Sequence, residues 1–344
     1  ISDLNGGKIK LLIVDDSNPV YALPPSMGFL QALKKTFVVS LASQKSETTH
    51  TANLVLPALT AYESWGDAFP RNGVRSIQQP VMSTVNMFDA RAREDILLSV
   101  AQNVNKKAFS ENSSYLDYLQ NIWQKIQRKV GDRRKFDSFW ISVLENGGIF
   151  EKPKFIRASL NRRVASVKLN DPGMASSDGL TLFPTTSLLL GDGGGANKPW
   201  LQEVPDPMSQ IVWDSWMEIN PDTAQKLGIN DRAIVEISTQ YGSVQATAYY
   251  HFGIHRNAIA IPMGQGHQHS GDVADGFGIN VMELLPDQMD KAGSLVFVGA
   301  KAKLKLINEK SYTVNTDGNA RQLGRDISAA TTVEELNNPE KHSS

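Results

Sequence analysis

The 344-residue sequence contains no cysteine. This absence excludes, within this stretch, iron–sulfur clusters held by cysteine, cysteine-rich zinc sites, disulfides and a cysteine nucleophile. The sequence also lacks any run of about 18 or more apolar residues, so no direct membrane span is predicted. Basic residues are not in excess, because 35 Lys and Arg face 36 Asp and Glu, for a formal net charge of −1. A nucleic-acid partner normally requires a basic face, and none is therefore expected.

The remaining composition is that of a folded protein with a sizeable core. Hydrophobic residues make up 41% and charged residues 21%, in a chain long enough for two or three domains. The sequence begins at Ile1 without a methionine or a signal peptide, and it enters a predicted strand almost at once. We therefore expect either a piece of a longer polypeptide or a deliberately shortened one.

Residues 1–150 are predicted to form an α/β domain with a parallel sheet. Short apolar runs that do not alternate are typical of strands covered on both faces, and strand, helix, strand in succession favours a βαβ unit. The segments that carry this prediction are strands at 9–14, 37–39 and 54–56 and a helix around 29–33. Two further helices are expected: one capped by Asp89, with Ile96, Leu97, Val100 and Val104 on its inner face, and one with a core stripe around Trp123.

The second half of the chain is predicted to be a β-barrel preceded by a connector. Residues 151–208 are interpreted as an irregular connector ending in the glycine-rich segment 191–195. Such glycines can cradle phosphate, but without a strand leading in and a helix following closely the connector is preferred. Residues 209–308 contain short strands, among them 295–298, and one capped helix, which indicates a compact barrel. Residues 309–344 are polar and are interpreted as a linker or tail.

Several short motifs become recognisable through their order and spacing. They are Ile13 to Pro19, where a strand ends in an Asn-Pro turn; Ser46-Glu47-Thr48-Thr49; Leu54-Val55-Leu56-Pro57 with Glu63 beyond; Trp213 to Pro221; and Gly264-Gln265-Gly266-His267 followed by Gly276, Gly278 and Asn280. Across residues 9–308 this series resembles the molybdopterin oxidoreductase superfamily. The resemblance implies an α/β domain followed by a dinucleotide-binding-like barrel of the six-stranded, double-psi-like type.

One branch of that superfamily is most similar. The segment Trp200-Leu201-Gln202-Glu203 and the pair Trp213 and Trp216 resemble the large peripheral subunit of alternative complex III. The resemblance implies a peripheral subunit of a membrane-bound quinol-oxidising electron-transfer complex, on the periplasmic face of the bacterial inner membrane. Its partners would be quinol-binding integral membrane subunits and cytochrome c subunits. Iron–sulfur clusters would lie in a continuation of the chain, joined through residues 321–327, or in a partner.

The resemblance also implies where a bis-pterin guanine dinucleotide would be recognised. Guanine needs a pair of acceptors, which catalytic relatives supply with a carboxylate at the position that Ala42 occupies here. A methyl group accepts no hydrogen bond, and the loss would cost roughly 1.5–3 kcal/mol. Asn53, where the family motif usually has Asp, keeps an acceptor without the charge. We therefore expect no cofactor in this stretch, which would act as a scaffold.

The alternative is a catalytic molybdenum oxidoreductase of the polysulfide- or thiosulfate-reductase type that binds molybdopterin guanine dinucleotide. A third hypothesis is a generic α/β protein with an attached barrel. Under the catalytic alternative, the family motifs place the cofactor-binding residues at Asn18, Ser46, Thr48, His267 and Asn280. No catalytic residue is assigned. The spacing of the sequence indicates no Ser-His-Asp set, and no acid–base partner can be identified for Glu47, Glu63 or Asp67. Glu47 is interpreted as a residue that anchors the backbone.

The histidines are weighed as possible metal ligands. His267 and His269 lie two residues apart in a glycine-rich loop near Asp272. Side chains at this spacing point to opposite sides of an extended segment, so joint ligation is not expected. Hydrogen bonding within the loop, or a subunit contact, is the preferred interpretation. His251 and His255 flank a turn and are expected to face solvent.

Overall fold

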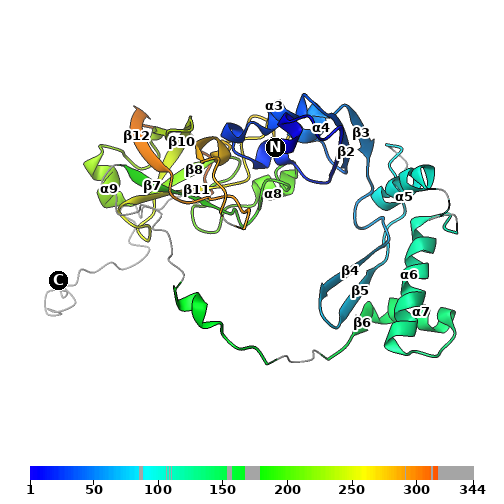
Figure 1. Cartoon of the computed structure of the whole chain (residues 1–344). Helices are drawn as coiled ribbons and strands as arrows, with labels where there is room; N and C mark the ends of the chain where they lie inside the picture. The colour runs from blue at the N-terminus through cyan, green and yellow to red at the C-terminus, as the bar shows by residue number, and fades with distance from the viewer. Residues whose placement is uncertain are drawn as a thin grey trace.

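The computed structural model describes residues 1–84, 88–105, 107, 109, 111–152, 157–166, 179–290, 292–310 and 313–316. Figure 1 shows three parts: a small parallel sheet with short helices, an antiparallel sheet with three longer helices, and a β-barrel. The predicted order, an α/β region followed by a barrel, is confirmed. Within residues 1–150, however, two separate sheets are present instead of one.

The N-terminal sheet has three parallel strands in the order β1-β2-β3. Its core is formed on one face, where Val14 and Val38 pack against Leu33 from a neighbouring helix. Because the strands are parallel, their carboxyl ends meet at one edge, and the loops that follow them start there. The elements are α1 (Ser2–Asn5), β1 (Leu11–Asp15), α2 (Pro19–Ala22), η1 (Pro25–Met27), α3 (Phe29–Leu33), β2 (Phe37–Ala42), α4 (Glu47–Thr51) and β3 (Leu54–Pro57).

The second part packs α6 and α7 against an antiparallel sheet of order β4-β5-β6, and α5 contacts α6. Its elements are β4 (Gly66–Arg71), β5 (Val74–Gln78), α5 (Arg93–Val104), α6 (Tyr115–Val130), α7 (Phe136–Asn146) and β6 (Gly148–Phe150). The aromatic stripe of α6 is core, as predicted, and Trp123 is fully buried at its centre. A capping box at Ser114 begins this helix and Gly131, in the left-handed conformation, ends it.

The prediction for α5 is wrong in its start and in its buried face. Its N-cap is Ala92, because Arg91 is still held in a β-bridge with Ala58 and the helix begins only after that bridge. Asp89 lies before the bridge with a φ of 49°. Leu98 is the buried residue of α5, whereas Val104, predicted to face inward, is 84% exposed.

The barrel is closed by six strands in the order β10-β8-β11-β7-β12-β9. Its core consists of alternate residues such as Val235 and Ile237, both fully buried. The elements are β7 (Leu180–Thr185), α8 (Pro199–Glu203), β8 (Trp216–Ile219), α9 (Pro221–Lys226), β9 (Ile234–Ser238), β10 (Ser243–Tyr250), β11 (Ala258–Pro262), η3 (Val281–Leu284) and β12 (Lys301–Asn308). Asn220 caps α9 through its side chain, as predicted.

Two sequence expectations about the barrel region are corrected. β7 pairs with β11 and β12 inside the barrel, although it lies in the segment predicted as an irregular connector. Residues 295–298 form no strand, and Leu295 makes only an isolated bridge with Met289. After β12 the chain crosses back along the barrel, where the N–H of Val212 donates to the carbonyl of Val314. The predicted link through 321–327 lies outside the described residues.

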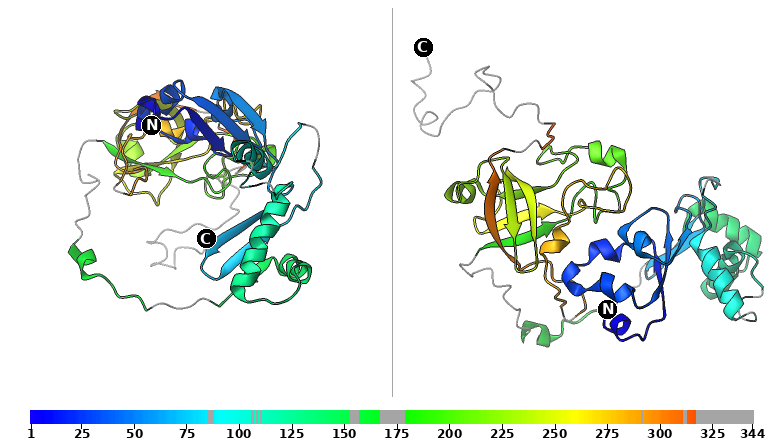
Figure 2. Two further views of the ribbon diagram at one scale, coloured as in Figure 1. Left: turned by 45° about the vertical axis from the view of Figure 1, so that its right-hand side comes forward. Right: turned by 90° about the horizontal axis from the view of Figure 1, so that it is seen from above.

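The barrel adjoins the helical side of the parallel sheet, while α6 and α7 lie at the opposite end of the molecule (Figure 2). We call the contact between the parallel-sheet region and the barrel the junction. It is formed by residues 18–21 and 46–50 on one side and the barrel loop 264–280 on the other. Within the described ranges, no helix combines the length and the apolarity needed to cross a bilayer.

Candidate functional site

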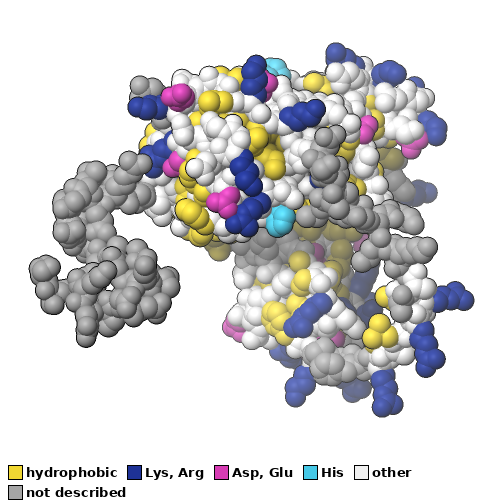
Figure 3. Space-filling model, turned by 90° about the vertical axis from the view of Figure 1, so that its left-hand side faces the viewer, with side chains coloured by type: hydrophobic (Ala, Val, Ile, Leu, Met, Phe, Trp, Pro, Cys, Tyr) yellow, Lys and Arg dark blue, Asp and Glu magenta, His cyan; other side chains and the backbone are white. Residues whose placement is uncertain are grey.

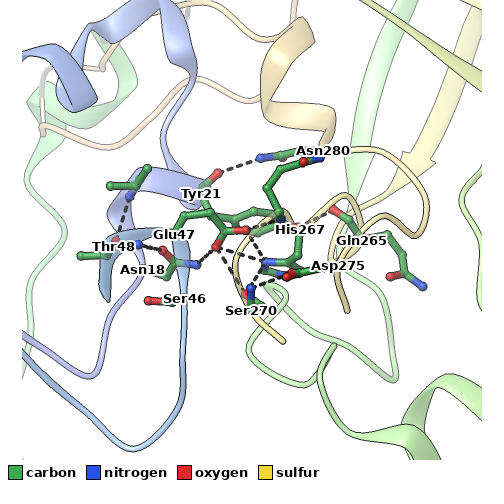
Figure 4. A network of polar contacts seen from close by, with 12 residues as sticks. Asn18, Tyr21, Ser46, Glu47, Thr48, Gln265, His267, Ser270, Asp275 and Asn280 are labelled. Carbon is green, nitrogen blue, oxygen red and sulfur yellow. Dashed lines mark hydrogen bonds and ion pairs between the residues drawn. The ribbon is translucent and has the colours of Figure 1, made fainter. Parts of the chain in front are cut away.

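The junction side chains are positioned by two loops at the carboxyl edge of the parallel sheet. After β1, Asn18 precedes Pro19, which begins α2. After β2, a capping box begins α4: the hydroxyl of Ser46 accepts from the N–H of Thr49 at 3.1 Å, and the hydroxyl of Thr49 accepts from the N–H of Ser46 at 2.7 Å. This capping box places Glu47 at the first helical position, pointing toward the barrel (Figure 4).

Glu47 is the centre of the junction. The whole residue is only 7% exposed. Its carboxylate accepts hydrogen bonds from both sides of the junction. From its own side it accepts from Nδ2 of Asn18 at 2.6 Å. From the barrel loop it accepts from Nδ1 of His267 at 3.1 Å, from the N–H of Gln268 at 2.8 Å and from the hydroxyl of Ser270 at 3.3 Å. A charged group is tolerated in a buried position only when it is paired and hydrogen-bonded in this way.

His267 is held between the carboxylate and an aromatic ring. It is 2% exposed, and its ring stacks on Tyr21 with centroids 3.9 Å apart and an interplanar angle of 13°. Its Nδ1 also lies 2.9 Å from the hydroxyl of Ser270. Because Glu47 accepts as a carboxylate, Nδ1 carries the proton in this pair. Nε2 is buried and has no hydrogen-bond partner among the described residues.

The glycine-rich segment 191–195 packs against this ring. A Cβ added at Gly193 would lie 2.7 Å from Nε2 of His267 and 2.9 Å from Cε1 of Tyr21, and the residue has a φ of +103°. Both the close approach and the backbone conformation require glycine here. The segment therefore closes over the histidine and forms part of the junction, which the prediction of a connector did not anticipate.

Burial and hydrogen bonding pull the pKa of Glu47 in opposite directions. Burial raises it, but hydrogen bonds from His267, Asn18 and the N–H of Gln268 outweigh burial and hold the pKa of Glu47 well below its usual range. For Tyr21, burial and then the charge of Glu47 raise the pKa of the phenol well above its ordinary value. The junction therefore holds one ionised carboxylate beside a neutral phenol at neutral pH.

The five residues predicted by resemblance converge at this junction. Oδ1 of Asn18 accepts from the N–H of Thr48 at 3.1 Å and from its hydroxyl at 2.8 Å. Nδ2 of Asn280 donates to the carbonyl of Tyr21 at 3.0 Å, and its Oδ1 caps η3. Ser46 contributes only as the cap of α4. Each of the five is thus engaged within the chain.

Sequence reasoning missed the partners that complete the network. Glu47 does anchor backbone, as expected, through the N–H of Gln268, but its side-chain partner across the junction is His267, 220 residues away. Tyr21 also donates its hydroxyl to the carbonyl of Gln265 at 2.8 Å. The one local signal was the position of Glu47 next to the Ser46 cap, which puts a carboxylate at the carboxyl edge of the sheet.

The remaining histidines differ partly from expectation. The side chain of His269 stacks on His50 with centroids 3.6 Å apart, across the junction and within the chain, a contact that the sequence did not predict. His251 does not face solvent freely, because its Nδ1 pairs with Glu218 at 2.8 Å and its side chain is only 33% exposed. His255 is exposed, as predicted. In the described part of the chain, no group of three or more His, Asp or Glu side chains is arranged to hold a metal ion.

A cavity of about 420 Å³ lies between the carboxyl edge of the parallel sheet, the strands β4 and β5 with the loop before them, and the start of α5. Asp16, Asp67 and Glu94 line it together with a single guanidinium, that of Arg93. Arg93 is bound to Asp16 through Nη2 at 3.2 Å. Burial raises the pKa of Asp67 and of Glu94. The lining therefore holds three carboxyl groups, two of them with a raised pKa, and one guanidinium that is already paired.

A pterin guanine dinucleotide fits these surroundings poorly. Ala42, at the end of β2, offers no acceptor for guanine, and the carboxylate beside it, Asp16, accepts from Ser43 and binds Arg93. Of the predicted contact residues, Asn18 and Thr48 are bonded to each other, and the side chains of Ser46, His267 and Asn280 are bonded to other groups of the chain. Nε2 of His267 has no hydrogen-bond partner among the described residues, but the Gly193 segment lies against it.

Comparison with known proteins shows what this chain is similar to. Residues 200–293 match the family model described as "Molydopterin dinucleotide binding domain". The fold resembles that of acetylene hydratase from Pelobacter acetylenicus, with a TM-score of 0.61 over 89% of this chain and 46% of that one, at 17% identity. The fold is thus an α/β region followed by a barrel, and the family match lies in the barrel. These matches support the resemblance of the chain to the molybdopterin oxidoreductase superfamily.

Curated relatives agree with this resemblance. The chain is 27% identical over 297 residues to the menaquinone reductase, molybdopterin-binding-like subunit, of Nitratidesulfovibrio vulgaris, covering 85% of this chain and 41% of the relative. It is 28% identical over 268 residues to a nitrate reductase of Symbiobacterium thermophilum, covering 70% and 35%. It is 23% identical over 310 residues to the assimilatory nitrate reductase catalytic subunit of Bacillus subtilis, covering 84% and 41%. The chain thus spans about two fifths of the length of these relatives.

These matches bear directly on the cofactor. The family model is named for dinucleotide binding, which supports the alternative of a molybdopterin guanine dinucleotide. It does not support the expectation that this stretch holds no cofactor. The geometry of the junction and the family match therefore point in different directions, and the two functions below follow from them.

Proposed function

We propose that this chain is part of a peripheral subunit of a membrane-bound quinone- or quinol-reactive electron-transfer complex, related to alternative complex III. In this proposal the region is a scaffold that holds the α/β and barrel parts in fixed register. Redox centres and the quinone site would belong to partner subunits or to further polypeptide. The subunit would lie on the periplasmic face of the inner membrane.

The observation that carries the proposal is the internally satisfied junction. The carboxylate of Glu47 binds Asn18 on one side and His267, Gln268 and Ser270 on the other. A site prepared for a large anionic ligand would instead present unpaired donors toward an open groove. A buried carboxylate that is hydrogen-bonded from both sides of the junction suits a structural role, because the rest of the junction then docks in one register.

A relative supports the assignment to a membrane complex. The similar protein of Nitratidesulfovibrio vulgaris carries the words "menaquinone reductase" and "molybdopterin-binding-like", and its match covers most of this chain. The sequence signature of Trp200 and the tryptophan pair points to the same kind of complex. Trp200 is 64% exposed and Met208 is 66% exposed, so side chains near the signature are available for a partner subunit. Trp213 instead packs on Phe277 with centroids 5.2 Å apart.

The test is affinity purification of the full-length protein from the native membranes. We expect integral membrane subunits and cytochrome c to co-purify with it, and quinol-dependent reduction of an acceptor in the preparation. A Trp200→Ala variant, compared with a Phe252→Ala control on an 83% exposed barrel residue, tests the signature surface. Recovery of the wild-type protein alone, in the soluble fraction and without quinol activity, would contradict the proposal.

The second candidate is a catalytic molybdenum oxidoreductase that binds the dinucleotide. It is favoured by the family match over residues 200–293 and by relatives named nitrate reductase. Under it, Asn18, Thr48, His267 and Asn280 would have to exchange their present partners for the ligand, with Ser46 positioning the loop. Bound guanine nucleotide and molybdenum in the purified protein distinguish the two candidates.

A further inference from the structure

The turn between α6 and α7 carries an unusual density of positive charge. Within residues 125–135 there are six basic side chains, all of them exposed, and one acidic side chain, Asp132. We call this cluster the basic turn; its members are Lys125, Arg128, Lys129, Arg133, Arg134 and Lys135. The chain as a whole has a net charge of −1, so the concentration of charge here is a local feature.

The basic turn has a fixed conformation. Gly131 ends α6 in the left-handed conformation, and the N–H of Asp132 closes the turn by donating to the carbonyl of Gln127. The buried side chain of Gln127 in turn donates to the carbonyl of Arg134 at 2.8 Å. Asp132 pairs with Arg134 at 2.7 Å, and in the described part of the chain the other five basic side chains have no acidic partner. The turn therefore presents free cations on an ordered support.

Helix stability does not account for this arrangement. Arg128 and Lys129 lie in the last turn of α6, where positive charge is favourable. Arg133, Arg134 and Lys135 directly precede α7, where positive charge opposes the helix dipole. Lys135 even occupies the N-cap position and makes no capping hydrogen bond, where Ser, Thr, Asp or Asn is preferred. The basic residues are placed against local stability, which indicates an external anionic ligand.

The surroundings distinguish a lipid surface from a protein partner. Residues 125–135 contain no exposed large apolar side chain, whereas protein interfaces usually centre on buried aromatic or apolar anchors. Clusters of four to eight Lys and Arg bind anionic headgroups without needing shape complementarity. The basic turn also lies at the end of the molecule opposite the barrel (Figures 1 and 2). In Figure 3, Lys and Arg side chains project from the lower part of the molecule.

We propose that the basic turn binds the headgroups of anionic phospholipids and orients the subunit on the membrane. The proposal takes from the proposed function only that a membrane is nearby. Binding rests on the attraction between exposed cations and a negative surface, so it weakens as salt screens the charges. The contact would be independent of the junction and of any cofactor.

The test is vesicle flotation of the full 344-residue chain. One set of vesicles contains phosphatidylcholine alone, and the other contains phosphatidylcholine mixed with phosphatidylglycerol. The test variant carries Lys125→Gln, Arg128→Gln, Lys129→Gln, Arg133→Gln and Lys135→Gln, and it keeps Arg134 to preserve the turn. The matched control neutralises five exposed lysines elsewhere, through Lys34→Gln, Lys45→Gln, Lys226→Gln, Lys303→Gln and Lys305→Gln. Both variants have the same net charge, and circular dichroism checks that both fold.

We expect the wild-type chain and the control to float with the phosphatidylglycerol vesicles only, and salt to release them. The basic-turn variant should bind at least about a hundredfold more weakly. Equal loss in the two variants, or no binding by the wild type, would overturn the proposal. Capture of the wild type by immobilised polyglutamate without vesicle binding would also overturn it, in favour of an acidic protein partner. Because no partner subunit is present, the result is separate from the test of complex membership.

Discussion

Replacement of Glu47 by Gln tests the junction most sharply. The substitution keeps the shape of the side chain but exchanges one acceptor oxygen for a donor group. An NH₂ at the Oε1 position would meet Nδ1–H of His267 and the N–H of Gln268. At the Oε2 position it would meet Nδ2 of Asn18, which cannot turn over without losing both bonds that its Oδ1 accepts from Thr48. In either orientation a buried donor loses its acceptor.

The magnitude follows from that loss. One charge-assisted hydrogen bond disappears and one buried donor is left unpaired, for a total of about 2–4 kcal/mol. The site that should report it is the N–H of Gln268, because its acceptor is Glu47 itself. Its protection against hydrogen exchange should fall by about 30- to 1000-fold if exchange proceeds through opening of the junction. Amides in α6, which packs in a different core, should keep their protection.

The matched control is Asp222→Asn, which removes an ion pair of similar geometry with Arg256 on the exposed surface of the barrel. An exposed pair contributes at most about 1 kcal/mol, so the exchange pattern should change little. The reasoning is refuted if Glu47→Gln leaves the exchange of Gln268 as slow as in the wild type. It is also refuted if the two substitutions have equal effects.

Three further predictions concern the same region. Because the folded-state pKa of Glu47 is depressed below the ordinary value of 4.5, its stabilising contribution is fully present above that value and is lost as pH falls through the folded-state pKa. The difference in melting temperature between the wild type and Glu47→Gln should therefore be constant at neutral pH and shrink in acid, as calorimetry would show. Gly193→Ala should cost about 2–4 kcal/mol in denaturant unfolding, through clash and backbone strain. Gly131→Ala, at a φ of +77° with open space around it, should cost only about 1 kcal/mol, and equal costs would contradict the close packing on His267. Ala42→Asp should give no measurable affinity for GDP by calorimetry, and a clear gain would point to a retained nucleotide site.

Local patterns predicted much of the fold. The apolar run at 9–14 became β1, and the stripe around Trp123 became the buried face of α6, since both follow the period of a single element. Asn220 was legible as a cap because capping depends on neighbours in sequence. The first residue of α5 could not be predicted, because the helix begins only after the bridge between Ala58 and Arg91. That bridge joins two segments that are distant in the sequence. β7 was missed because a short strand containing Pro184 has little local signal.

The candidate site, like the fold, could be predicted from the sequence only in part. The resemblance supplied the five positions that converge at the junction, from Asn18 to Asn280. Their present bonding could not be read from sequence, since the pairing of Glu47 with His267 depends on where the barrel docks against the sheet. The contribution of Gly193 depends likewise on the ring that packs against it. The composition gives only the net charge of the whole chain, so it did not reveal the local cluster of positive charge in the basic turn.

In the proposed function, the Glu47–His267 network occupies the junction in place of a cofactor. The most direct test is the content of molybdenum, tungsten and guanine nucleotide in the full-length protein purified from its native membranes, by elemental analysis and by chromatography of the acid-released nucleotide. The account predicts iron, but neither molybdenum nor tungsten nor GMP in stoichiometric amount. Stoichiometric molybdenum together with GMP would contradict it and establish the catalytic alternative.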